Sequence, residues 1–85
     1  MMYGIIFSSR AQKSFDQLTS EDQERIIEVL ERVRDRPHMF ARQLKGSSLY
    51  KLRVGKNRII FDINETEKRL EVHKVGDRKN IYKRQ

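Results

Sequence analysis

The feature that most constrains the fold of this chain is a hairpin pattern in its second half. Apolar and polar residues alternate over 49–54, Gly55 and Lys56 follow, and the alternation resumes over 57–63. A period of two is typical of a strand with one buried face. Two such runs joined by a two-residue turn with glycine predict a β-hairpin.

The register of this hairpin brings like charges together. Pairing Val54 with Asn57 places Arg53 directly opposite Arg58, on the same face as Lys51. Like charges directly opposite each other destabilise a sheet, so folding alone gives no reason for them. We expect an anionic partner at this face, and nucleic-acid phosphate is the first candidate.

The distribution of charge supports a nucleic-acid partner. The net charge is +7, with six Lys/Arg against seven Asp/Glu in residues 1–37 and thirteen against five in residues 38–85. Residues 41–61 contain six basic residues and no acidic one. A positive field of this kind favours contact with nucleic acid. The alternative is a basic surface that serves solubility only.

Length and composition limit the remaining classes. Eighty-five residues predict a single domain over 1–85. The chain has no cysteine, which excludes disulfides and thiolate zinc sites. No apolar stretch approaches the roughly 20 residues of a membrane-spanning helix, and the N-terminus lacks a signal-peptide pattern. We therefore expect a cytoplasmic protein with no membrane partner.

One strand and two helices are predicted before the hairpin. Residues 3–7 form a short strand, with Tyr3, Ile5 and Phe7 on one face. Ser8 or Ser9 is a suitable N-cap for the first helix. Its apolar residues, spaced four and three apart, are Ala11, Phe15 and Leu18.

The second helix has a start signal and a stop signal. Ser20 followed by Gln23 is a capping-box pattern, and Pro37 ends the helix by Arg36. The predicted apolar stripe of this helix is Ile26, Ile27, Leu30 and Val33.

The element order βααβββ predicts an α+β fold. Residues 38–48 are expected to form a connecting loop, and a last strand runs over about 69–75. Three sequential strands with short turns should be antiparallel, with the helical hairpin packed on one face of a small antiparallel sheet. The predicted core face carries Tyr50, Leu52, Val54, Ile59, Phe61, Leu70 and Val72. The predicted opposite face carries Lys51, Arg53, Arg58, Ile60, Asp62, Glu71 and His73.

A set of short segments lies in order along the second half of the chain: Leu44 to Gly46, Tyr50 to Gly55, Arg58 to Phe61, Val75 to Arg78, and Tyr82. Together they resemble the RelE/ParE toxin superfamily. The order of elements and the small basic size are similar as well. The resemblance implies a RelE-like microbial RNase-type fold and the toxin of a type II toxin–antitoxin system, with a cognate antitoxin as partner.

The two branches of the superfamily imply different targets. The RelE branch cleaves mRNA in the ribosomal A site without a metal, so that the ribosome and mRNA are its partners. The ParE branch shares the fold and inhibits DNA gyrase. The full basic set plus Tyr82 favours a RelE-like endoribonuclease. The alternatives are a ParE-like inhibitor and a non-catalytic nucleic-acid-binding module.

The RelE pattern matches five positions as catalytic candidates. RNA cleavage through the 2′-hydroxyl requires a base, an acid and positive charge on the phosphate. Lys51 is the candidate base, because neighbouring cations favour the neutral amine; a simple phosphate contact is the alternative. Arg53 stands where the best-known RelE enzymes carry a second lysine, and it stays protonated. We expect it to hold phosphate.

The remaining catalytic candidates have a functional and a structural interpretation. Arg58 is expected to grip the scissile phosphate, or else to pair with Asp62 or Glu71. Arg78 is expected to stabilise the transition state, or else to pair with an acidic neighbour. Tyr82 is expected to stack on a base beside the cut, or else to pack against the sheet.

Four further cations flank this set and suit contact with RNA backbone. They are Arg42, Lys45, Lys56 and Lys79. For each of them singly, a solvated surface charge is the alternative. His73 is an acid/base candidate that the family pattern does not require. No His, Asp and Glu set shows metal-ligand spacing along the sequence, so we expect neither a metal nor a cofactor.

Overall fold

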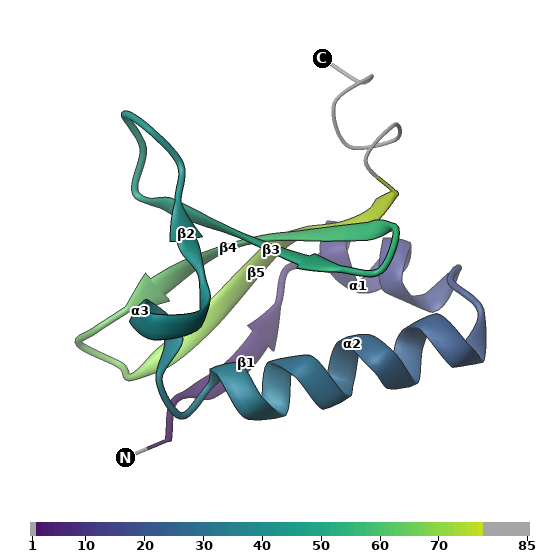
Figure 1. Cartoon of the computed structure of the whole chain (residues 1–85), viewed down its shortest axis with the longest axis horizontal. Helices are drawn as coiled ribbons and strands as arrows, with labels where there is room; N and C mark the ends of the chain where they lie inside the picture. Colours follow the sequence, from purple (N-terminus) through teal and green to yellow (C-terminus); the bar gives the residue numbers. More distant parts are fainter. Residues whose placement is uncertain (1, 78–85) are drawn as a thin grey trace.

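The chain folds as a five-stranded mixed sheet with two helices packed on one face (Figure 1). The computed structural model describes residues 2–77. The elements in chain order are β1 (Gly4–Phe7), α1 (Ser9–Asp16), α2 (Ser20–Val33), α3 (Pro37–Phe40), β2 (Arg42–Gln43), β3 (Leu49–Val54), β4 (Asn57–Asn64) and β5 (Arg69–Asp77). The predicted α+β class is confirmed.

The sheet order β1-β5-β4-β3-β2 differs in one respect from the expected antiparallel sheet. Strands β2 to β5 are antiparallel to their neighbours, whereas β1 lies parallel to β5. Both long helices lie between β1 and the next strand in the sequence, so no short turn constrains β1 to pair with that strand. Strand β1 pairs with β5, on the side of β5 away from β4. Alternation along a strand predicts which face is buried but not which neighbour the strand takes.

The predicted loop over 38–48 contains two short elements. Pro37 occupies the first turn of α3, where its missing N–H costs nothing. Strand β2 then pairs with β3 through Arg42 opposite Lys51 and Gln43 opposite Tyr50. A four-residue helix and a two-residue strand are too short to show a hydrophobic period, which is why the sequence suggested a loop.

Side-chain caps begin both long helices. The Oγ of Ser8 accepts a hydrogen bond from Ala11 N at 3.0 Å, as one of the two predicted caps. At α2 the cap is Thr19 rather than Ser20, and its Oγ1 accepts from Asp22 N at 3.2 Å. Gln23 does not complete a capping box with Ser20. Its amide instead donates to Phe15 O at 2.9 Å and ties α2 to α1.

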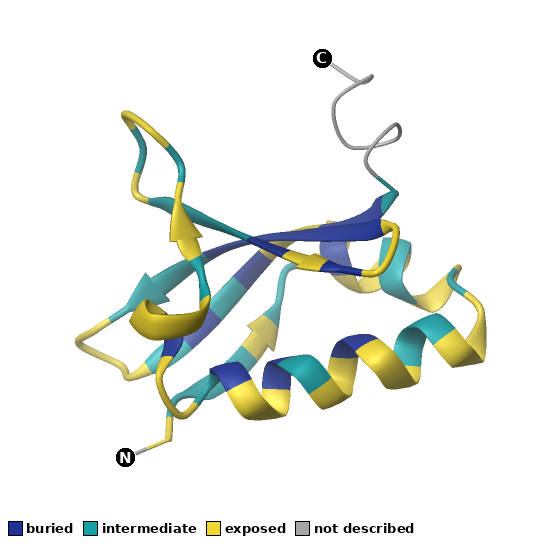
Figure 2. Cartoon of the chain, viewed as in Figure 1, coloured by how far each residue is buried: buried dark blue, intermediate teal, exposed yellow. Residues whose placement is uncertain are grey.

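The core lies between the sheet and the two long helices (Figure 2). Ile26, Leu30 and Val33 of α2 are buried as predicted, whereas Ile27 is 42% exposed and lies outside the stripe. From the sheet, the core receives Leu52, Val54, Ile59, Phe61, Leu70, Val72 and Val75. Full burial of one such side chain contributes roughly 1.5–3 kcal/mol, so this face determines the register.

A bulge interrupts the alternation of β5. Ile60 lies opposite Lys74 and Phe61 lies opposite Val72, which leaves His73 as the extra residue. Val75 therefore returns to the core one position out of step with a simple alternation. Beyond this point, every side chain of β5 lies on the face opposite to that predicted by parity.

None of the helices in the described part of the chain is long and apolar enough to span a membrane.

Candidate nucleic-acid interface

The side of the sheet away from α1 and α2 is here called the outer face, and cations gather at one end of it. The predicted register of the hairpin is confirmed, with Arg53 directly opposite Arg58. On the next row, Lys51 lies between Arg42 of β2 and Ile60 of β4. The two rows belong to three neighbouring strands. Four cations therefore lie side by side.

A fifth cation joins them because of the bulge. Lys74 lies opposite Ile60, on the same row of the outer face as Lys51. Simple alternation from Leu70 and Val72 would point it into the core, and the sequence analysis missed it for that reason. The sequence signal for this change was Val75, an apolar residue at a position that alternation from Leu70 and Val72 assigns to the outer face. Arg42, Lys51, Arg53, Arg58 and Lys74 are called the basic cluster below.

The members of the basic cluster differ in exposure. Arg42, Arg53 and Lys74 are exposed and Lys51 is partly exposed. Within residues 2–77, none of these four forms an ion pair with a carboxylate. Arg58 lies on β4, between β3 and β5, and is only 7% exposed. It also takes part in an interaction within the chain.

The other predicted RNA contacts do not converge on this cluster. Lys45 lies in the turn that precedes β3, and Lys56 lies in the turn that follows it. Both are exposed, and the six residues of β3 separate them by about 20 Å. Lys45 is carried by the β2–β3 hairpin, which projects from the sheet (Figure 1). Arg78, Lys79 and Tyr82 lie outside the described residues.

The opposite end of the outer face carries acidic residues. Asp62 lies directly opposite Glu71, and His73 follows two residues later on β5. Glu71 Oε2 accepts from Arg69 Nε at 2.9 Å and from Asn64 Nδ2 at 3.1 Å. The hydrogen bonds from Arg69 and then Asn64 hold the pKa of Glu71 below its usual value. Asp62, Glu71 and His73 form the carboxylate–histidine cluster.

Comparisons with known proteins identify the family. The family model described as "ParE toxin of type II toxin-antitoxin system, parDE" matches residues 5–82. The chain belongs to this family. It is therefore the toxin of a toxin–antitoxin system, within the superfamily that the sequence segments resemble. A search among curated proteins finds no match.

Solved structures with the fold of this toxin include several RelE proteins. A mutant of E. coli RelE in the free state is 27% identical, with a TM-score of 0.83 over 98% of this chain and 90% of that chain. RelE in the intact E. coli RelBE complex is 26% identical, with a TM-score of 0.76 over 88% and 95%. The RelBE2 complex from Mycobacterium tuberculosis contains a chain with 16% identity and a TM-score of 0.84 over 92% and 100%, which shows the fold alone.

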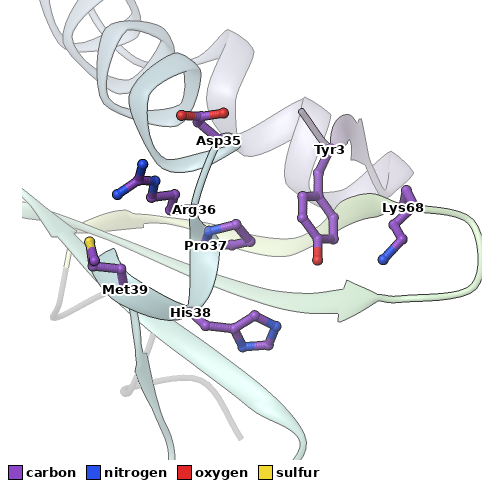
Figure 3. A pocket seen from close by; sticks show the side chains of 7 residues that line it. All are labelled: Tyr3, Asp35, Arg36, Pro37, His38, Met39 and Lys68. Atoms are coloured by element: carbon purple, nitrogen blue, oxygen red, sulfur yellow. The ribbon is translucent and has the colours of Figure 1, made fainter. Parts of the chain in front are cut away.

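The toxin has a second polar region, beside α3. An open pocket of about 370 Å³ is lined by Tyr3, Asp35, Arg36, Pro37, His38, Met39 and Lys68. Figure 3 shows that these side chains come from the residue before β1, from α3 and its approach, and from the β4–β5 turn.

The polar groups around this pocket satisfy one another. Glu65 accepts from the Tyr3 hydroxyl at 2.8 Å and also bonds His38 Nε2. Tyr50 Oη reaches His38 Nδ1 at 3.3 Å, and Lys68 pairs with Glu65 at 3.5 Å. These five residues are called the polar corner. The hydrogen bond from His38, followed by that from Tyr3, lowers the pKa of Glu65, and the bond to Glu65 raises the pKa of Tyr3.

Proposed function

We propose that this toxin is a ribosome-dependent endoribonuclease that cleaves mRNA in the ribosomal A site. The observation that carries the proposal is the basic cluster, in which four cations have no carboxylate partner within the described chain. Repulsion between them costs folding free energy that an RNA phosphate would recover. The ribosome and mRNA are thus the proposed partners, and the cytoplasm is the proposed location.

In the proposed chemical step, the 2′-hydroxyl of the mRNA is the nucleophile and side chains of the toxin are the catalytic groups, while the ribosome presents the mRNA. The hydroxyl loses its proton to the base, and its oxygen bonds to the adjacent phosphorus. The bond from phosphorus to the 5′ oxygen breaks as that oxygen takes up a proton from a cationic side chain of the site. The products are a 2′,3′-cyclic phosphate and a 5′-hydroxyl. No bound metal is required, because lysine and arginine side chains supply the base, the acid and the positive charge.

Four of the five members of the basic cluster have a proposed role at the cut, and Arg42 keeps its expected role as a contact to RNA backbone. Lys51, at the centre of its row, is the proposed base. Arg53 and Lys74, both exposed, hold the phosphates on either side of the cut. Arg58 is more deeply placed, and its proposed role is to stabilise the charge that develops on the scissile phosphate. Arg78 and Tyr82 keep the roles expected from the sequence, as transition-state stabiliser and base-stacking residue.

Antitoxin binding is the second part of the proposal. Solved relatives of this fold include complexes with an antitoxin, and a partner of this kind belongs to a toxin of this family. We propose that the antitoxin carries acidic residues and lays a helix or strand over the basic cluster or in place of the C-terminal segment. An antitoxin that covers the basic cluster would keep RNA away from these cations and would thereby block activity.

A second candidate function is inhibition of DNA gyrase. The description of the matching family names ParE, and Arg53 replaces a lysine that the best-known RelE enzymes carry. A gyrase inhibitor needs positive charge for contact but no base at Lys51.

One experiment separates the candidates. The purified toxin is added to mRNA with translating ribosomes, to the same mRNA without ribosomes, and to gyrase in a supercoiling assay. We expect cleavage only when ribosomes are present. Intact mRNA with inhibited supercoiling would assign the toxin to the ParE branch. Salt-sensitive binding to RNA with neither effect would leave a non-catalytic binding module.

A further inference from the structure

Three metal-ligating side chains lie together on the outer face, outside the basic cluster. One ligand atom from each of Asp62, Glu71 and His73 can be chosen so that all three lie within 4.8 Å of one another. The carboxylates come from directly opposite positions on β4 and β5. The imidazole joins them because His73 follows Glu71 by two residues and so lies on the same face of β5, at the bulge.

The geometry of the carboxylate–histidine cluster is close to that of an occupied site. Around a tetrahedral zinc ion with bonds of about 2.0–2.1 Å, neighbouring ligand atoms lie roughly 3.4 Å apart. Side-chain rotation can close the difference, because all three side chains are only partly buried or exposed. The backbone need not move, since the two strands are already paired on both sides of the bulge.

Supporting contacts orient the two carboxylates. Asp62 Oδ1 accepts from Ile63 N at 2.9 Å, and Glu71 Oε2 accepts from Arg69 and Asn64. Within the described chain, the second oxygen of each carboxylate makes no hydrogen bond. Contacts that hold one oxygen and present the other are typical of the outer shell of a metal site.

Charge gives a reason for the cluster to take a cation. Two carboxylates directly opposite each other repel, and Arg69 compensates only one of them. With a neutral imidazole, the cluster and Arg69 together carry a charge of −1, at the border of a strongly basic face. The imidazole nitrogen favours a transition-metal ion over Mg²⁺ or Ca²⁺, which take oxygen ligands.

We propose that Asp62, Glu71 and His73 bind one divalent transition-metal ion of the zinc class. The site is separate from the proposed cleavage reaction, in which no metal takes part. Its ligands lie beside the row of Lys51, Ile60 and Lys74. A bound ion would replace the negative end of the outer face with positive charge and would link β4 to β5 at the bulge.

The test uses the full-length toxin without an affinity tag. Zinc is titrated into the wild-type chain, the His73→Ala variant and the His38→Ala variant, with heat as the readout. The His38→Ala variant is a matched control, because the chain has only two histidines and each lies beside a glutamate. Circular dichroism checks that all three proteins are folded.

We expect one zinc ion per wild-type chain. Zinc affinity should fall by at least about tenfold in His73→Ala, because mutation of even the residues that support metal ligands costs that much. It should be unchanged in His38→Ala. An Asp62→Asn variant should also lose affinity. The imidazole resonances of His73 in the wild-type chain should shift when zinc is added.

The opposite results would overturn the site. They are no saturable zinc binding to the wild-type chain, equal affinity in His73→Ala, or loss of binding in His38→Ala. Equal affinity for Mg²⁺ would reject the transition-metal class. Every readout is independent of RNA cleavage, so failure of the proposed function would leave this result intact.

Discussion

The basic cluster and the polar corner both bring together charged side chains from separate elements. They differ in whether those charges have partners of opposite sign within the described chain. In the polar corner, Glu65 alone receives bonds from Tyr3, His38 and Lys68. In the basic cluster, four of five cations find no carboxylate in the described chain. The polar corner borders a pocket, whereas the basic cluster carries positive charge without a carboxylate partner in the described chain.

This difference is the reason that we propose a binding role for the basic cluster and a structural role for the polar corner. Polar groups that satisfy one another gain little from a ligand, because binding must first break the existing bonds. Cations that only repel one another gain from any anion that reaches them. The pocket beside α3 is bordered by polar groups that already satisfy one another, whereas four of the cations on the outer face of the sheet lack such partners within the described chain.

The largest expected effect is on Lys51. We expect Lys51→Ala to reduce the rate of mRNA cleavage on ribosomes by about 100-fold or more, the usual contribution of a positioned base. Stability should be unchanged or slightly improved, because the substitution relieves repulsion with Arg42. Cleavage rates under single-turnover conditions and thermal melting measure the two quantities.

The control for this variant is Lys13→Ala. Lys13 is an exposed lysine of α1, and its removal changes the net charge by the same amount. Equal loss of cleavage in both variants would show that total charge, and not the base at position 51, limits the reaction.

A smaller effect is expected at Lys74. The variant Lys74→Ala should weaken RNA binding uniformly across sequences and reduce the slope of log affinity against log salt by about one, as for the loss of one phosphate contact. Binding at a series of salt concentrations measures this slope. Lys68→Ala, which removes a lysine from the polar corner, should leave it unchanged. An unchanged slope in Lys74→Ala would remove Lys74 from the interface.

The smallest effect concerns the pH dependence of the polar corner. The pKa of Glu65 is lower in the folded chain than its ordinary value of 4.5, chiefly because of the hydrogen bond from His38. Its stabilising contribution is therefore fully present above that value and is lost as pH falls through the folded pKa. Thermal melting should show wild type more stable than Glu65→Gln near neutral pH, with the two converging in acid.

The comparison variant for this test is Glu67→Gln. Glu67 is an exposed glutamate of the same turn and forms no ion pair within residues 2–77. Its substitution should not change the pH profile of melting. A Glu65→Gln profile identical to wild type at every pH would contradict the role assigned to the polar corner.

Much of the fold was accessible to sequence reasoning because its signals are local. Alternation, a glycine turn and apolar spacing predicted the β3–β4 hairpin, its register and the buried faces of α1 and α2. Thr19 was missed as the cap of α2, since two adjacent hydroxyl residues compete for that position. Ile27 was wrongly placed in the core, because it adjoins a stripe that Ile26 already fills.

The sequence by itself determined the hairpin register, and with it the repulsive pair Arg53 and Arg58, because side chains of a strand alternate strictly and only one register buries the apolar set. Tertiary structure decided the rest. Pairing of β5 with β4 required a bulge, and that single extra residue turned Lys74 outward into the basic cluster and Val75 inward to the core. Contacts between strands distant in sequence leave no period to read, so these positions emerge only when the sheet is assembled.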